Sequence, residues 1–132
     1  MNQNRYFSLT NLTPSIIHFK INNIDPTPVE FDEYLKIHSD SLLNSQRIAV
    51  IYDISDGKFL TSEQRIKLGK MVSQNSENMK KYVACVAYVN TSVMAGIILK
   101  GILLVSPMPV PNKVFTTTEA ATAWCNEMLG NR

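Results

Sequence analysis

The sequence predicts an α/β fold with a mostly parallel sheet and an N-terminal hairpin, in a single domain covering residues 1–132. Three observations predict it. The runs Ile48 to Ile54 and Tyr82 to Val89 are almost continuously apolar, which is typical of strands buried on both faces. Segments with the apolar spacing of helices alternate with the strand-like runs. Two short alternating runs come before all of these.

Composition narrows the class of protein. Apolar residues make up 45% of the chain, charged residues 18%, and the net charge is only +2. The basic residues are scattered, so the chain lacks the basic patch of a nucleic-acid-binding protein. The N-terminal residues do not resemble a signal peptide. The longest apolar run, Val93 to Val105, is too short to span a bilayer. We therefore expect a cytoplasmic protein without a nucleic-acid partner or integral membrane association.

The hairpin is predicted from two alternating runs near the N-terminus. Arg5 to Leu12 and Ser15 to Asn22 are the two strands, and Thr13-Pro14 favours a turn between them. A helix then begins near Thr27, because a proline in the first turn and the acidic residues after it suit a helix N-terminus. His38 lies on or beside the apolar stripe of this helix. It is either a ligand or base, or a boundary residue whose ring is hydrogen-bonded.

The central stretch joins a buried strand, a turn and a helix start. Asp56-Gly57 is a turn dipeptide, and either Thr61 or Ser62 caps a helix that runs to about Met79. In open α/β sheets, ligands and partners are met beyond the carboxyl ends of the strands. The polar residues of this stretch are therefore the first candidates for a functional site: Asp53, Ser55, Asp56, Thr61 and Ser62.

The C-terminal half continues the alternation of strands and helices. We expect a helix over Val93 to Val105, because a parallel sheet needs a crossover after the strand Tyr82 to Val89. Three prolines then form a rigid connector before a short strand, Lys113 to Phe115. Thr116 opens a capping box for the last helix, which Gly130 ends. The predicted order is β-β-α-β-α-β-α-β-α with right-handed crossovers.

No strong catalytic motif accompanies this fold. We find no phosphate loop, nucleophile elbow or metal-ligand spacing, and we expect no cofactor and no metal. Cys85 and Cys125 are expected to be buried free thiols, with a disulfide or a reactive thiol as alternatives. An enzyme would need an acid–base group, for which nothing in the sequence fixes the spacing. Its members would come from Asp53, Asp56, Ser55, Ser62 and His38.

The element order and two short blocks resemble the STAS fold of bacterial anti-sigma-factor antagonists. Asp53-Ile54-Ser55 resembles the end of that family's central strand. An ungapped comparison of the loops places Thr61 on the Asp of the family's Asp-Ser-Ser-Gly motif, and Ser62 on its phosphorylated Ser. Glu63 and Gln64 replace the other two motif residues. The second block, Val110 to Thr117 followed by Glu119, Ala120 and Ala123-Trp124, resembles an uncharacterised bacterial branch of STAS-like proteins.

The resemblance covers roughly Ile48 to Leu129 and implies a non-enzymatic signalling module that works through contacts with an unknown protein partner. It also implies Ser62 as a candidate for phosphorylation. The CRAL-TRIO lipid binders share the general architecture. A carrier or sensor of a small apolar, lipid-like ligand is therefore the alternative, with Met94, Met108 and the proline bend lining a pocket.

The apolar helix predicted over Val93 to Val105 suggests self-association. Its apolar residues surround the helix axis, and Lys100 is its only charge. A helix that covers a sheet buries one stripe, so the remainder would form an exposed apolar patch. We expect a symmetric homodimer to cover it, and the alternative is that a partner protein or a membrane surface does so. The expected interface residues are Met94, Ile97, Ile98, Gly101, Ile102 and Val105.

Overall fold

The computed structural model describes residues 4–42, 46–57, 60–93, 96–97, 99–100 and 108–130. It confirms the α/β fold, in which a β-hairpin is followed by alternating helices and strands. Helix and strand bounds agree with the expected ones to within a few residues for most of the chain. The elements are β1 (Phe7–Thr13), β2 (Ile16–Ile21), α1 (Pro28–Leu42), β3 (Ile48–Asp53), α2 (Ser62–Gln74), α3 (Ser76–Tyr82), β4 (Val83–Val89), β5 (Asn112–Phe115) and α5 (Thr118–Gly130).

The five strands form one sheet in the order β1-β2-β3-β4-β5. β1 and β2 pair antiparallel as the expected hairpin, and every other neighbouring pair is parallel. β3 and β4 are adjacent at the centre, with Val50 opposite Val86 and Tyr52 opposite Tyr88. This confirms the prediction that the two apolar runs are neighbouring parallel strands. It follows from their composition, because only a strand covered on both faces gains from apolar residues at successive positions.

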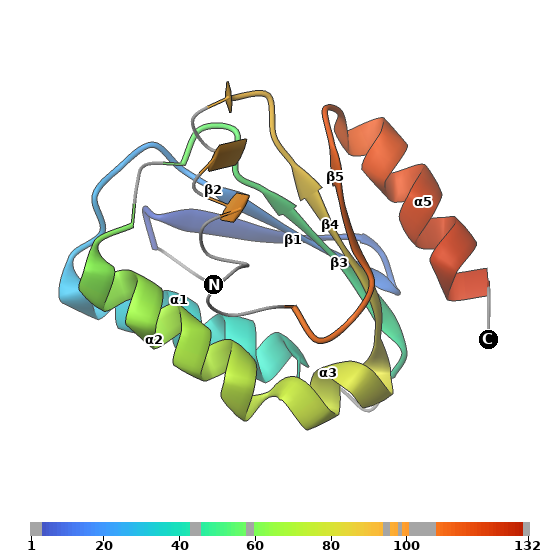
Figure 1. The fold of residues 1–132 in the computed structure, drawn as a ribbon, viewed down its shortest axis with the longest axis horizontal. Coiled ribbons are helices and arrows are strands. Elements are labelled where there is room, and N and C mark those ends of the chain that lie inside the picture. The colour runs from blue at the N-terminus through green and yellow to red at the C-terminus, as the bar shows by residue number, and fades with distance from the viewer. Residues whose placement is uncertain are drawn as a thin grey trace.

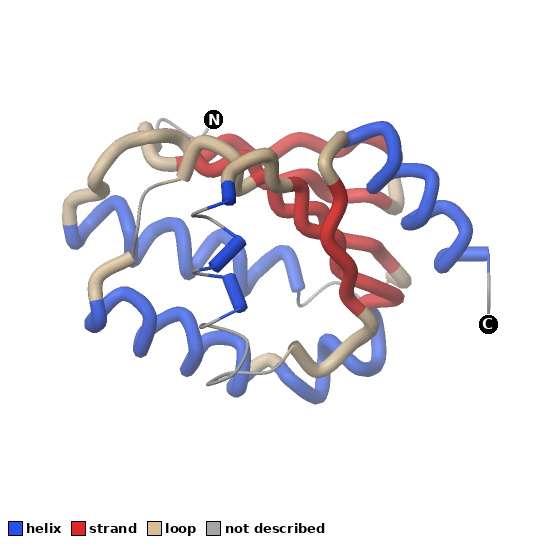
Figure 2. Tube along the Cα trace, turned by 45° about the horizontal axis from the view of Figure 1, so that its top comes forward, coloured by secondary structure: helices blue, strands red, loops and turns tan. Residues whose placement is uncertain are grey.

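Helices cover the sheet unequally. Figures 1 and 2 show α1, α2 and α3 on one face and α5 on the other. The face under α1 to α3 is rich in aromatic rings, whereas the face under α5 is lined by small side chains. We call these the aromatic face and the small-residue face. The aromatic face is centred on Tyr6, Phe7, Phe19, Phe31, Tyr34, Tyr52 and Tyr88. The small-residue face is centred on Ala49, Cys85, Ala87, Ala121 and Cys125.

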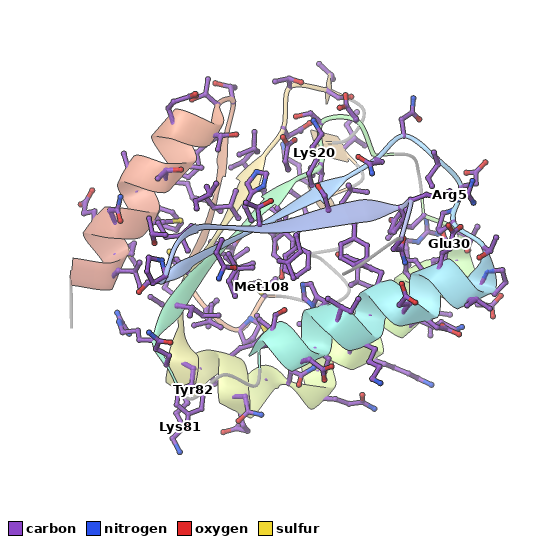
Figure 3. The ribbon with its side chains drawn as sticks, turned by 180° about the vertical axis from the view of Figure 1, so that it is seen from behind. Arg5, Lys20, Glu30, Lys81, Tyr82 and Met108 are labelled. Carbon is purple, nitrogen blue, oxygen red and sulfur yellow. The ribbon has the colours of Figure 1, made fainter. Side chains whose placement is uncertain are left out.

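An ion pair fixes the N-terminal end of β1 to α1. The Arg5 guanidinium donates from Nε to Glu30 Oε2 and from Nη2 to Glu30 Oε1, both at 2.8 Å, and the two side chains point toward one another in Figure 3. Glu30 Oε1 also accepts a hydrogen bond from the Thr27 backbone N–H at 2.9 Å. Arg5 and the bond from Thr27 together hold the pKa of Glu30 down to about 2. The carboxylate therefore joins the hairpin to the first turn of α1.

The helix predicted to run from Ser62 to Met79 is two helices, so that prediction is wrong at Asn75. The chain leaves α2 at Asn75 and enters α3. Asn75 is buried, and its side-chain amide donates to the Met71 carbonyl at 2.8 Å and to Ser39 Oγ at 3.0 Å. An asparagine side chain that bonds to a nearby carbonyl competes with continuation of the helix. The contact with α1 makes this arrangement favourable, and the sequence pattern around Asn75 does not indicate it.

The start of α5 also differs from the prediction. The Ala120 N–H donates to Thr117 Oγ1 at 3.1 Å, so Thr117, and not Thr116, caps the helix. α5 extends to Gly130, the residue predicted to end it, which is also the last residue that the structure describes. Adjacent threonines offer the same capping chemistry, and the position of the strand before them decides which one is used.

Candidate functional site

The carboxyl ends of β3 and β4 meet at one edge of the sheet, where Ser55 connects them. The Ser55 N–H donates to Asp53 Oδ1 at 3.1 Å, and Ser55 Oγ accepts from the Thr91 N–H at 3.2 Å. The same hydroxyl lies 3.5 Å from the Val89 carbonyl as a donor. The backbone N–H of Ile54 adds a bond to the Val89 carbonyl at 3.0 Å. The hydrogen bonds of Ser55 therefore link the ends of β3 and β4, and its hydroxyl already has partners within the chain.

Asp56 and Lys20 form an ion pair beside these strand ends. Lys20 Nζ lies 3.5 Å from Asp56 Oδ2, and both side chains are largely exposed. Lys20 is also the cross-strand neighbour of Asp53 in the pairing of β2 with β3. The expected group Asp53, Ser55 and Asp56 is thus brought together by one turn. Its charges are opposed by a lysine from β2 that the sequence pattern did not single out.

Thr61 and Ser62 begin α2, and the structure assigns them different roles. Thr61 is the N-cap: its Oγ1 accepts from the Gln64 N–H at 3.1 Å, and its own N–H donates to Gln64 Oε1 at 2.9 Å. Ser62 is the first helical residue and is exposed. Arg65 Nη2 donates to Ser62 Oγ at 3.1 Å, and Arg65 Nη1 donates to the Leu60 carbonyl at 3.1 Å. The Ser62 hydroxyl therefore has no capping role and lies beside a cation at a helix N-terminus.

His38 lies on the aromatic face and takes no part in this edge. It is 2% exposed, its Nε2 is hydrogen-bonded to the Tyr52 hydroxyl, and its Nδ1 lies 3.3 Å from Met71 Sδ. Burial lowers its pKa to about 3, so the ring is neutral at pH 7. The hydrogen-bonded, structural interpretation of His38 is correct, although the residue is fully buried and not at a boundary. Among the described residues His38 therefore does not join Asp53, Ser55, Asp56 and Ser62 in an acid–base group.

Two polar residues near the edge were not predicted. Arg65 carries the contact to Ser62, and only its position three residues further along the helix hints at this. His18 lies on β2 beside Ile51, and its Nε2 is buried without a hydrogen-bond partner in the described part of the chain. Burial lowers the pKa of His18, and the nearby charge of Asp53 opposes that shift. In the sequence, His18 is simply one polar member of an alternating strand.

The segment after β4 presents an apolar surface. Val93 and Ile97 are helical and four residues apart, which places them on one side of a helix, and they are 81% and 60% exposed. Leu99 is only 8% exposed and belongs to the core of the aromatic face. We call Val93 and Ile97 the exposed apolar pair. The other five predicted interface residues lie outside the described residues: Met94, Ile98, Gly101, Ile102 and Val105. Self-association through this helix remains a prediction.

The two cysteines meet between β4 and α5. Both are buried and free, as expected, and their Sγ atoms lie 3.9 Å apart. The contact lowers the pKa of Cys85 and raises that of Cys125, and burial also raises the latter. Cys125 belongs to the interior contact of α5 with the sheet, together with Ala121. Both thiols are thus members of the small-residue core.

The described residues contain no group of three or more His, Cys, Asp or Glu side chains placed to hold a metal ion. In the same part of the chain, no helix has the length and apolar character needed to cross a membrane. Met108, one of the residues considered for an apolar pocket, is half-buried against the aromatic core, and Figure 3 labels it there. The other, Met94, lies outside the described residues.

Comparison with known proteins establishes the fold. No family model matches the chain, and no curated protein matches it. A solved structure does: an uncharacterised protein of the DUF3478 family from Shewanella loihica PV-4, with a SpoIIAA-like fold. The two share 14% sequence identity, with a TM-score of 0.65 over 90% of this chain and 91% of that one. The chain has a SpoIIAA-like fold, which is the STAS-like fold that its sequence resembles.

Within this SpoIIAA-like fold, the candidate site is the edge formed by the turn after β3, the start of α2 and the end of β4. It contains all five residues that the sequence singled out there: Asp53, Ser55, Asp56, Thr61 and Ser62. The described atoms join the first three into one hydrogen-bonded and ion-paired turn, whereas the last two are bonded within α2. The STAS-like fold accounts for the placement of the site at the strand ends, and it does not by itself assign an activity.

Proposed function

We propose that this chain is a non-enzymatic, cytoplasmic regulatory module that binds another protein through the edge containing the start of α2. The observation that carries the proposal is the state of Ser62. Its hydroxyl is exposed at the first residue of α2, Thr61 supplies the cap, and Arg65 lies 3.1 Å away. The Ser62 hydroxyl does not cap the helix and lies at the surface beside a cation. It is therefore suited to modification and to contact with a partner.

Phosphorylation of Ser62 is the regulatory step we propose. A phosphate carries a charge of about −1.5 to −2 at pH 7 and three acceptor oxygens. At this position it would lie at the positive end of the α2 dipole, beside the Arg65 guanidinium. Glu63, in the same turn, opposes it by repulsion. The modification would therefore change the charge of the edge while leaving the Thr61 cap in place.

The exposed apolar pair supports a protein as the partner. Val93 and Ile97 follow the end of β4 and so begin near the same edge of the sheet. Between them and β4, Asn90 Oδ1 accepts a hydrogen bond from the Ser92 N–H at 2.8 Å. Large apolar side chains beside a polar, chargeable loop are the composition of a protein-binding surface: an apolar centre with a polar rim.

The experiment compares partner capture by four forms of the purified chain: wild type, Ser62→Ala, Ser62→Glu and the control Ser73→Ala. Ser73 is exposed on the same helix, away from its N-terminus. We expect mass spectrometry of protein from its native cell to detect phosphate on Ser62. We also expect wild type and Ser73→Ala to capture the same partner, and Ser62→Glu to lose or exchange it.

Identical capture by all four forms, with Ser62 unmodified, would contradict the proposal. A native mass spectrum of the same preparations tests the alternative function. An apolar ligand carried by the protein would appear as added mass, and would move the assignment from an interaction module to a carrier.

A further inference from the structure

The two outermost strands of the sheet, β1 and β5, differ in how they are protected against pairing with another strand. β5 has only four residues, follows Pro111 and carries Lys113, which are the features by which proteins prevent pairing at an edge. β1 has seven residues, FSLTNLT, with neither a charge nor a proline. Ser8 to Leu12 are all exposed, and Figure 3 shows β1 crossing the front of the molecule above α1. β1 is thus an unprotected edge strand.

The hydrogen-bond pattern identifies the backbone groups of β1 that point away from β2. The Asn22 N–H donates to the Tyr6 carbonyl at 2.8 Å, so these two residues form a hydrogen-bonded pair of the hairpin. Hydrogen-bonded and non-hydrogen-bonded pairs alternate along antiparallel strands. The register continues with Phe7 opposite Ile21. The N–H and C=O groups that point away from β2 are therefore those of Phe7, Leu9 and Asn11.

We infer that a second copy of this chain pairs antiparallel with β1, centred on Leu9, to form a two-fold dimer with one continuous sheet. Around Leu9 the outward groups are self-complementary, because Phe7 of each copy lies opposite Asn11 of the other and Leu9 lies opposite Leu9. Leu9 and Leu12 are 37% and 41% exposed, and pairing would cover them. The inference does not depend on the proposed function, which uses the start of α2 and the exposed apolar pair.

The absence of charge makes a second copy the occupant that fits best. Like charges directly opposite one another destabilise strand pairs, and β1 has none to place against itself. A β1 edge with a lysine or glutamate would instead require a partner strand of opposite charge. Because the β5 edge is protected, pairing through β1 stops at a dimer.

The test is a charge exchange at Leu9, read by light scattering at protein concentrations on the order of tens of micromolar. We expect the wild type at twice the 14.9 kDa chain mass. Leu9→Lys and Leu9→Glu alone should each be monomeric, because each places two like charges at the two-fold axis. Mixed in equal amounts, the two variants should return to the dimer mass. The control Ile97→Lys, which places the same charge on the exposed apolar pair, should remain dimeric.

Several outcomes would overturn the inference. A monomeric wild type would do so, as would a Leu9→Lys variant that remains dimeric. So would an equal mixture of Leu9→Lys and Leu9→Glu that stays monomeric while circular dichroism shows that both variants are folded. An Ile97→Lys variant that is monomeric, beside a dimeric Leu9→Lys, would also overturn it and would place the dimer on the helix predicted over residues 93–105. None of these outcomes depends on Ser62, so the proposed role of Ser62 is tested separately.

Discussion

His38 illustrates how one buried residue couples the fold to pH. Its ring packs between Phe19 and Tyr34, with centroid distances of 4.9 and 5.7 Å, and is hydrogen-bonded to Tyr52. Protonation would place a charge among aromatic rings, with no carboxylate of the described residues bonded to it. This explains why burial lowers the pKa of His38 in the folded chain. In the unfolded chain the pKa returns to an ordinary value of about 6.5.

The pH dependence follows from this difference. Below about pH 6.5 the unfolded chain binds a proton at His38 that the folded chain does not bind until about pH 3, so stability falls as the pH falls. We expect the free energy of unfolding to drop by about 2 kcal/mol between pH 7 and pH 5 from this residue. His18, whose pKa is also lowered, adds to the drop with the same sign. Urea denaturation at several pH values measures it.

The control is His38→Gln, whose amide keeps a hydrogen-bonding group for Tyr52 but does not titrate. This variant should start at a lower stability and show most of the pH 7 to pH 5 slope removed. A wild-type curve that is flat over this interval, or an unchanged slope in His38→Gln, would show that His38 is accessible to protons in the folded state.

At the scale of single elements, the first turn of α2 decides what its two hydroxyl residues can do. The capping box formed by Thr61 and Gln64 satisfies N–H groups that a helix start leaves without partners. Ser62 contributes no bond to this box and instead accepts from Arg65. An ordinary structural role is thus assigned to Thr61, and Ser62 remains available for a functional one.

Alanine substitution at the two positions separates these roles. Thr61→Ala should lower the free energy of unfolding by about 1 kcal/mol, as the loss of an N-cap does. Ser62→Ala should change it by less than about 0.5 kcal/mol, because an exposed side chain with one surface bond contributes little. Chemical denaturation of both variants beside the wild type gives the comparison. An equal loss in both, or a larger loss in Ser62→Ala, would mean that Ser62 takes part in the cap.

At the scale of the whole molecule, the two faces of the sheet are built from different side chains. The aromatic face is thick, with stacked pairs such as Tyr52 and Tyr88 at 5.7 Å between ring centroids. The small-residue face brings α5 close, since Ala121 and Cys125 are both fully buried against β3 and β4. Phe115 and Trp124 pack at the border of this contact, 5.5 Å apart. The close approach of α5 depends on small residues on both sides.

Enlarging one of these small residues should therefore lower the stability of the fold. We expect Ala121→Leu to lower the free energy of unfolding by about 1 to 3 kcal/mol, because overpacking forces the helix away from the sheet. Ala120→Leu, one residue earlier on the exposed side of α5, should stay within about 0.5 kcal/mol of the wild type. Thermal and urea unfolding of both variants provides the measurement. If Ala121→Leu is as stable as Ala120→Leu, α5 is not packed as closely as its burial indicates.

The sequence by itself determined the architecture, because the information lies in local patterns. The apolar runs that became β3 and β4 are typical of strands covered on both faces, and the alternating N-terminal runs favour a hairpin. The same patterns placed Asp53 and Ser55 at a strand end and a hydroxyl at the start of α2.

The tertiary structure alone decided the details that depend on residues far apart in the chain. The break at Asn75 depends on its contact with Ser39 in α1. The pairing of Lys20 with Asp56 depends on the hydrogen-bonded turn that lies beside β2. The contact of Cys85 with Cys125 depends on the docking of α5. Periodicity reports which face of an element is buried, but only the folded chain determines which side chain it is buried against.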